Sequence, residues 1–238
     1  MMAKTMNFSI KLRERTQRGF SLLELSIAMV ILAVVIAVIV SGVTQLQKTN
    51  ASQAINVDLT QESRQFMDQI VEDLHQAGFP SIAMFDTVTS AANPNLYAVG
   101  LVSVSTTQIQ YEGDVDGSTT CNPICSGVSE VIVQLSPTGG PCPCKLLRGA
   151  VSKALYAGGT LPTYYTEVDG VNNLNIFTAY DKAGNVIPLP CAAGVCADGS
   201  SIANIKDIGI LLNVKSNTPN PITNTYTNIT MSTEAKIE

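Results

Sequence analysis

One long apolar segment constrains this chain more than any other feature of its sequence. Residues 20–40 have the sequence FSLLELSIAMVILAVVIAVIV, and from Leu25 to Val40 only Ser26 is polar. About 20 apolar residues are enough for a helix to cross the hydrocarbon core of a bilayer. The segment therefore predicts a transmembrane helix, and Glu24 is the one carboxylate placed within it.

The distribution of charge predicts how that helix is oriented. Residues 1–19 contain five basic residues and one acid, which gives them a net charge of +4. The whole chain carries −5, so the remaining residues carry −9. Basic residues before the apolar segment place the N-terminus in the cytoplasm and the rest of the chain outside. An acidic body also disfavours nonspecific binding to nucleic acid.

Glu24 needs a physical explanation, because a carboxylate in hydrocarbon costs about 2.5–3.5 kcal/mol and is usually paired. In a secretory signal peptide the small residue of the cleavage site follows the apolar run. Here Gly19 precedes it. Cleavage after Gly19 would leave the helix attached and give Phe20 a free α-amino group, one helical turn from Glu24. The equivalent amine of a neighbouring subunit could also neutralise Glu24. The alternative is that Glu24 lies at the headgroup level of a simple signal anchor.

The segment resembles a known processing site. Residues 18–25, RGFSLLEL, are similar to the prepilin peptidase site of type IV pilins and type II secretion pseudopilins. This resemblance implies that the peptidase cleaves after Gly19 and methylates the new N-terminal Phe20. It also implies that Glu24 guides docking of the subunit into a growing filament.

A helical pattern continues beyond the apolar segment. Leu59, Phe66, Ile70 and Leu74 recur at spacings typical of one helix face, and acids including Asp73 are expected on other faces. Gly78 followed by Phe79-Pro80 predicts the end of the helix. Bending or local melting is expected at Gly42 and Asn50. The single histidine, His75, is assigned a packing or surface role.

Several runs rich in β-branched residues and bounded by turns predict strands after residue 80. The expected strands are 96–105, 107–113, 129–135, 144–151, 173–181, 182–189, 205–216 and 226–238. One long helix followed by an antiparallel sheet is an α+β arrangement. The expected organisation is a cleaved leader at 1–19, a transmembrane and assembly segment at 20–42, an amphipathic segment at 43–78, and a β-rich extracytoplasmic body at 79–238.

The order of these runs extends the resemblance. The succession IQYEGDVDG, SEVIVQL, KLLRGAV, LNIFTAYDKAGN and IKDIGILLNVKS is similar to that of minor pilins of the PilW type. The cysteine-rich turns, the incomplete acidic loop and the terminal AKIE depart from that pattern. The resemblance implies a subunit that primes a type IV pilus or lies at its tip. It also implies an inner-membrane location before assembly and a periplasmic or extracellular one afterwards.

The partners implied by the resemblance are the prepilin peptidase, an inner-membrane assembly platform, and other minor and major pilins. Two alternatives remain open at this point. One is a J-type minor pseudopilin of a type II secretion system, and the other is an adhesin or binding module anchored by a pilin helix. An enzyme is not expected, because a single histidine leaves little acid–base chemistry and no nucleophile or phosphate-loop motif is present. No cofactor is expected either.

All the cysteines lie beyond the apolar segment. They are Cys121, Cys125, Cys142, Cys144, Cys191 and Cys196. An even number in an exported region predicts disulfides, since the spacings do not match common zinc sites. Cys191 and Cys196 are expected to close a local loop. Cys142 and Cys144 are too close in sequence for an easy mutual bond, so each is expected to pair with one of the other two.

Two smaller charged groups complete the candidate sites. Asp114 and Asp116, in the sequence GDVDGST, are weak candidates for binding calcium, and Glu112 and Glu130 are expected near them. The EF-hand spacing is absent, so an acidic turn is the simpler interpretation. Lys145, Arg148 and Lys153 form a small basic group, which is interpreted as a solvated strand face.

Overall fold

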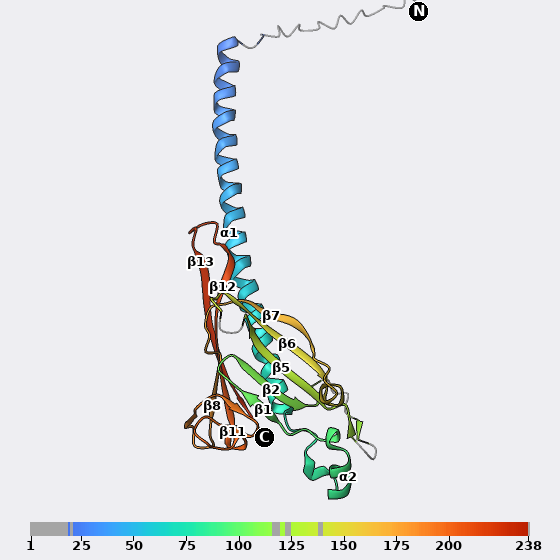
Figure 1. The fold of residues 1–238 in the computed structure, drawn as a ribbon. Coiled ribbons are helices and arrows are strands. Elements are labelled where there is room, and N and C mark those ends of the chain that lie inside the picture. The colour runs from blue at the N-terminus through green and yellow to red at the C-terminus, as the bar shows by residue number, and fades with distance from the viewer. Residues whose placement is uncertain (1–18, 20, 116–119, 122–124, 138–139, 238) are drawn as a thin grey trace, which may run out of the picture. The chain divides into compact units, whose positions relative to one another are not determined.

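A computed structural model of the chain describes residue 19 and residues 21–115, 120–121, 125–137 and 140–237 (Figure 1). These residues form two compact units, the first ending at Lys48 and the second beginning at Thr49. The first unit holds the beginning of the long helix. The second unit holds the remainder of that helix and all the strands.

The long helix, α1 (Leu22–Gln76), continues without interruption through Gly42 and Asn50, so the helix does not melt there, and bending at these residues stays a prediction. In the second unit one face of α1 is buried, including Leu59, Phe66 and Leu74. The chain leaves the helix through Gly78, whose φ of 90° suits glycine. The predicted stripe and the predicted helix end are therefore confirmed.

Short helical segments join the other elements. They are η1 (Ile82–Met84), α2 (Thr87–Ala92), η2 (Pro94–Leu96), α3 (Lys153–Ala157) and η3 (Ile202–Asn204). The longer strands are β1 (Leu101–Val104), β2 (Gln108–Gly113), β5 (Ser129–Ser136), β6 (Cys144–Ser152), β7 (Thr163–Val171), β8 (Phe177–Tyr180), β12 (Asp207–Pro219) and β13 (Tyr226–Lys236). The two-residue strands are β3 (Thr120–Cys121), β4 (Cys125–Ser126), β9 (Val186–Ile187), β10 (Cys191–Ala192) and β11 (Val195–Cys196).

The described strands form one large antiparallel sheet and one small hairpin. The order in the large sheet is β11-β10-β1-β2-β5-β6-β7-β12-β8-β9, and β13 pairs with β12. The hairpin consists of β3 and β4. The β12–β13 pair extends over most of both strands, from Asp207 opposite Lys236 to Lys215 opposite Asn228. Figure 1 shows β2, β5, β6 and β7 side by side, in keeping with this order.

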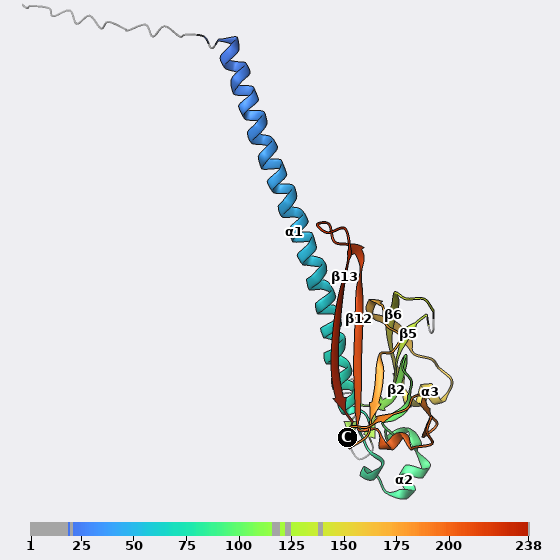
Figure 2. The same ribbon diagram turned by 90° about the vertical axis from the view of Figure 1, so that its left-hand side faces the viewer.

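The core of the second unit lies between α1 and the sheet. Phe66, Ile70 and Leu74 from the helix belong to one buried cluster with strand residues such as Val133 and Leu212. Figure 2 shows the second-unit part of α1 alongside the β12–β13 hairpin. Asn220, at the tip of that hairpin, donates a hydrogen bond from Nδ2 to Ser52 Oγ on α1 at 2.6 Å. The observed architecture confirms the α+β prediction.

Strand β7, which pairs with β6, was not predicted from the sequence. The first part of β7 is largely exposed, so it lacks the alternation of apolar residues by which a half-buried strand is recognised. Its pairing with β6 is also irregular, with register shifts around Leu146. Gly170 takes a φ of 77°, and a Cβ at this position would collide with the carbonyl oxygen of Lys215 on β12.

Candidate processing and assembly site

The N-terminal site is built on the first turn of α1. Gly19 is exposed, and the helix begins three residues later at Leu22. The backbone N–H groups of Glu24 and Leu25 donate to the carbonyl oxygen of Ser21 at 2.9 and 3.1 Å. Phe20 lies outside the described residues. The bond expected to be cleaved, after Gly19, therefore begins at an exposed residue that lies three positions before the start of α1.

Glu24 occupies the first turn of α1, where its charge interacts favourably with the positive end of the helix dipole. Its own side chain and those of the surrounding apolar residues are exposed, and Leu22 is 86% exposed. A carboxylate surrounded by unburied apolar surface is suited to bind a cation supplied by another chain. It is also poorly suited to remain unpaired in hydrocarbon.

The apolar side chains that follow remain exposed throughout the first unit. Among the described residues, α1 is the one helix long and apolar enough to cross a membrane, judged by length and composition. None of its most apolar stretch of 18 residues is buried inside the chain. Soluble monomers rarely expose so large an apolar patch, so this surface requires either lipid or neighbouring helices around it.

The comparison with protein families matches this segment. Residues 15–40 match the family model described as the prokaryotic N-terminal methylation motif. The motif supports a type IV pilin-like protein. It implies processing by a prepilin peptidase and assembly with other pilins, and the exposed apolar helix fits anchoring in a membrane. The matched family is structural rather than enzymatic. No curated protein and no solved structure matches the chain.

The cysteines pair partly as predicted. Cys191 bonds to Cys196 within the β10–β11 hairpin, as expected. Cys142, however, bonds to Cys144, so the predicted pairing of these two residues with Cys121 and Cys125 is wrong. The turn before β6 brings the Cα atoms of Cys142 and Cys144 to 4.5 Å, which lies within the range that disulfides span. The backbones of Cys121 and Cys125 lie opposite each other in the β3–β4 hairpin.

The candidate calcium site remains a prediction. Asp114 directly follows β2, whereas Asp116 lies outside the described residues. Over the part of the chain that the structure describes, no group of three or more His, Cys, Asp or Glu residues is arranged to hold a metal ion. His75 is exposed near the end of α1, in keeping with the surface role assigned to it.

The basic group was misinterpreted from the sequence, because two of its three members are internal. Arg148 extends from β6 to Asp73 on α1, with Nη2 at 2.8 Å and Nε at 2.9 Å from the same carboxylate oxygen. Tyr111 on β2 donates its hydroxyl to that oxygen at 2.7 Å. Asp73, expected on a face other than the apolar stripe, is buried next to that stripe, and only 4% of the residue is exposed. Lys145 does remain at the surface, 3.6 Å from Asp169.

Electrostatics explain why Asp73 has several partners. Burial raises the pKa of the Asp73 carboxyl, while Arg148 and the Tyr111 hydroxyl oppose that rise. Burial and the neighbouring carboxylate also raise the pKa of Tyr111 well above its usual value, so its hydroxyl stays protonated and donates. This cluster of Asp73, Tyr111 and Arg148 joins the helix to the sheet through polar contacts inside an otherwise apolar interface.

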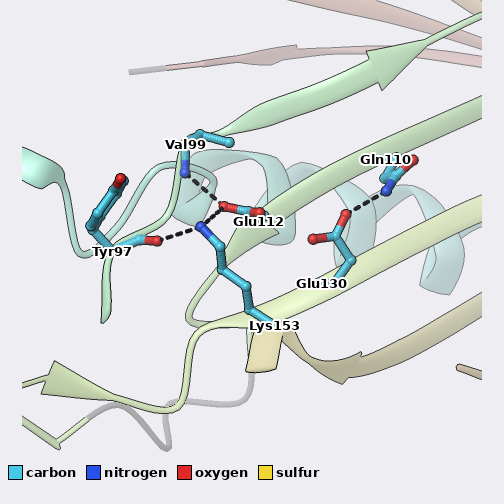
Figure 3. A network of polar contacts seen from close by, with 6 residues as sticks. All are labelled: Tyr97, Val99, Gln110, Glu112, Glu130 and Lys153. Carbon is cyan, nitrogen blue, oxygen red and sulfur yellow. Dashed lines mark hydrogen bonds and ion pairs between the residues drawn. The ribbon is translucent and has the colours of Figure 1, made fainter. Parts of the chain in front are cut away.

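A second buried polar cluster joins β2, β5 and α3. Figure 3 shows Lys153 reaching Glu112, with Glu130 beside it on the neighbouring strand. Lys153 Nζ lies 2.7 Å from Glu112 Oε2, and the lysine and glutamate side chains are only 13% and 8% exposed. From the sequence, Glu112 and Glu130 were grouped only as neighbours of the acidic turn at Asp114, and nothing indicated that Lys153 joins them. Glu112 and Glu130 occupy paired positions only once the register of β2 and β5 is known.

Proposed function

We propose that this chain is a minor pilin, a structural subunit that primes assembly of a type IV pilus or is incorporated at its tip. The observation that carries the proposal is the methylation motif at residues 15–40 together with the exposed apolar first half of α1. A prepilin leader and an unburied apolar helix are both needed by a subunit that waits in a membrane and then packs against other helices. The large sheet of the second unit suits a specialised subunit of low copy number.

The mechanism follows from the chemistry of the first turn. A peptidase removes residues 1–19, and the new amine on Phe20 is methylated. Within the inner membrane the N-terminus faces the cytoplasm and the β-rich region lies outside. During assembly the helix leaves the lipid, and Glu24 pairs with the cationic N-terminus of a neighbouring subunit. Burial of the apolar helix against other pilins then supplies the cohesion of the filament.

The intact mass of the membrane-extracted protein tests this processing. The expected mass lacks residues 1–19 and carries one added methyl group. Cells without prepilin peptidase should yield the uncleaved, unmethylated form, because on this proposal that enzyme cuts after Gly19 and methylates Phe20. Gly19→Val should give the same uncleaved form in cells that have the enzyme. A full-length mass for the wild-type protein in peptidase-containing cells would contradict the proposal and leave a simple signal anchor.

Copy number and phenotype test the minor role. Quantitative mass spectrometry of sheared pili should find this chain as a small minority of the subunits, and its deletion should reduce the number of pili. Normal piliation with loss of protein secretion would instead favour a J-type pseudopilin. Processing alone does not distinguish these two, since both machines use the same peptidase motif.

A further inference from the structure

Two carboxylates and one ammonium group are enclosed together at the junction of β2, β5 and α3. Glu112 on β2 lies directly opposite Glu130 on β5, and the two residues are 6% and 2% exposed. Lys153, the first residue of α3, enters the same space. A buried ion pair usually matches its charges one to one, because an unpaired buried charge is expensive. The second carboxylate therefore calls for a chemical explanation.

The contacts around Glu112 resemble those of a reacting carboxyl group. Oε2 of Glu112 accepts a hydrogen bond from the backbone N–H of Val99 at 2.9 Å. Lys153 Nζ lies 2.7 Å from the same oxygen and also donates to the carbonyl oxygen of Tyr97 at 2.9 Å (Figure 3). The amine is thus held against the carboxyl group, and a fixed backbone donor is aimed at the oxygen on which negative charge would develop.

Glu130 lies beside this pair, opposite Glu112 on the neighbouring strand (Figure 3). Gln110 Nε2 donates to Glu130 Oε1 at 2.6 Å and to the Tyr156 hydroxyl at 3.2 Å, which fixes the orientation of the glutamate. Burial raises the pKa of Glu130 to about 7, against a lowering by Gln110 and Lys153, and the neighbouring Glu112 raises it further. A carboxyl group that titrates near neutrality is an effective general acid and base at that pH.

We propose that Lys153 and Glu112 condense to form an intramolecular amide bond, with Glu130 carrying protons between them. Lys153 Nζ attacks Cδ of Glu112, a C–N bond forms, and the bond from Cδ to Oε1 breaks. Of the three protons on the ammonium group, one remains on the amide nitrogen and two pass through Glu130 to Oε1. That oxygen leaves as water, and Glu130 ends in the protonation state in which it began. No oxidant, reductant or activating group is required.

Proximity and burial favour this condensation over the open ion pair. Lys153 Nζ lies 2.7 Å from Glu112 Oε2, so each group meets the other at a high effective concentration, which reaches about 10⁵–10⁸ M in well-oriented intramolecular reactions. The enclosed position of both side chains also disfavours hydrolysis by excluding water. The resulting bond joins β2 to the start of α3, and β5 lies between these two elements in the chain. Unlike the disulfides, this bond survives reduction. All the groups involved lie in residues 97–156, so the inference is independent of leader processing.

The intact mass of the full chain, purified from membranes and fully reduced, tests the bond directly. The expected mass is lower than the sequence predicts by one water molecule, in addition to any change at the N-terminus. Trypsin should fail to cleave after Lys153, and fragmentation should place Glu112 and Lys153 in one branched peptide. Recovery of both residues in separate linear peptides, with complete cleavage after Lys153, would overturn the proposal whether or not the leader is removed.

Three variants separate the chemistry from a purely structural role. Lys153→Arg keeps the positive charge but lacks a nucleophilic amine. Its intact mass should therefore equal the mass expected without the bond, with no water lost. Glu130→Gln keeps the shape and the hydrogen-bonding capacity of the side chain and should leave Lys153 and Glu112 unlinked. Lys145→Arg, at the exposed pair with Asp169, is the matched control and should retain the full loss. If Glu130→Gln still forms the bond fully, so that its intact mass is lower by one water molecule, the proton-carrying role given to Glu130 is overturned.

Discussion

Arg148→Met is expected to destabilise the second unit by about 3–5 kcal/mol, the cost of breaking a buried ion pair from one side. The variant leaves the Asp73 carboxylate in the helix–sheet interface with the Tyr111 hydroxyl but without its cation. The Asp73 and Arg148 side chains are 5% and 16% exposed, so water screens little of the loss. Urea unfolding of the detergent-solubilised full chain, followed by tyrosine fluorescence, would measure the change because the chain has 7 tyrosines and no tryptophan.

The effect of Arg148→Met should depend on pH in a direction fixed by Asp73. Burial raises the pKa of Asp73 and Arg148 lowers it, so the variant carries a carboxyl with a still higher folded pKa. A carboxyl whose pKa rises on folding favours the folded state below its unfolded pKa of about 3.9. That contribution is lost as pH rises through the folded pKa. The destabilisation should therefore be smaller near pH 4 than near pH 8.

Two controls make the comparison specific. Lys145→Met removes an exposed ion pair with Asp169 and should cost no more than about 1 kcal/mol. Asp73→Leu combined with Arg148→Met removes both charges and should recover much of the lost stability, since replacing a whole buried pair is often tolerated. Equal stability losses for Arg148→Met and Lys145→Met would contradict the role assigned to the cluster of Asp73, Tyr111 and Arg148.

Glu24→Leu is expected to lower incorporation of the chain into pili by about 100-fold while leaving leader cleavage intact. On the proposed assembly mechanism, the carboxylate leaves an environment that costs about 2.5–3.5 kcal/mol and gains a cationic partner in the filament. Since 1.4 kcal/mol corresponds to a factor of ten, loss of this preference amounts to about two orders of magnitude. Immunoblots of the sheared pilus and membrane fractions from the same cells would measure the ratio.

Ser26→Ala is the matched control for Glu24→Leu. Ser26 is a polar residue two positions after Glu24, and its hydroxyl already donates to the Leu22 and Leu23 carbonyl oxygens within the helix. Its replacement should leave incorporation unchanged. Incorporation of Glu24→Leu at the wild-type level would show that Glu24 plays no part in assembly. The variant should accumulate in the membrane fraction, because it is more apolar than the wild type.

Regular periodicity explains which parts of the fold could be predicted from the sequence. The buried face of α1 follows the spacing of Leu59, Phe66, Ile70 and Leu74, and the hairpin of β8 and β9 follows its turn at Asp181. In these places the local pattern and the tertiary environment agree. Strand β7 could not be predicted, because its exposed first part is stabilised by pairing with β6 rather than by burial of its own side chains.

The charged clusters could not be predicted, because the partners are far apart along the chain. Asp73 and Arg148 are separated by 75 residues, so neither residue reveals that the other will be buried beside it. From the sequence, charged residues such as these are reasonably expected to be exposed to solvent. Their burial becomes evident only from the way α1 packs on the sheet. The bond between Cys142 and Cys144 was missed for the opposite reason, because a general expectation about short spacing was applied to a turn that brings the two residues together.

The contacts of α1 have a consequence for the order in which the chain can fold. Ser52 on α1 meets Asn220 across 168 residues, and Glu62 accepts a hydrogen bond from the backbone of Asp169 across 107. Such long loops must close before their contacts are gained, which makes folding slow. The buried face of the helix is synthesised early, but its cover is complete only when β12 and β13 have followed β5 and β6. Until then the emerging polypeptide exposes part of the surface that Phe66 and Leu74 bury in the folded chain, which favours capture by chaperones over early compaction.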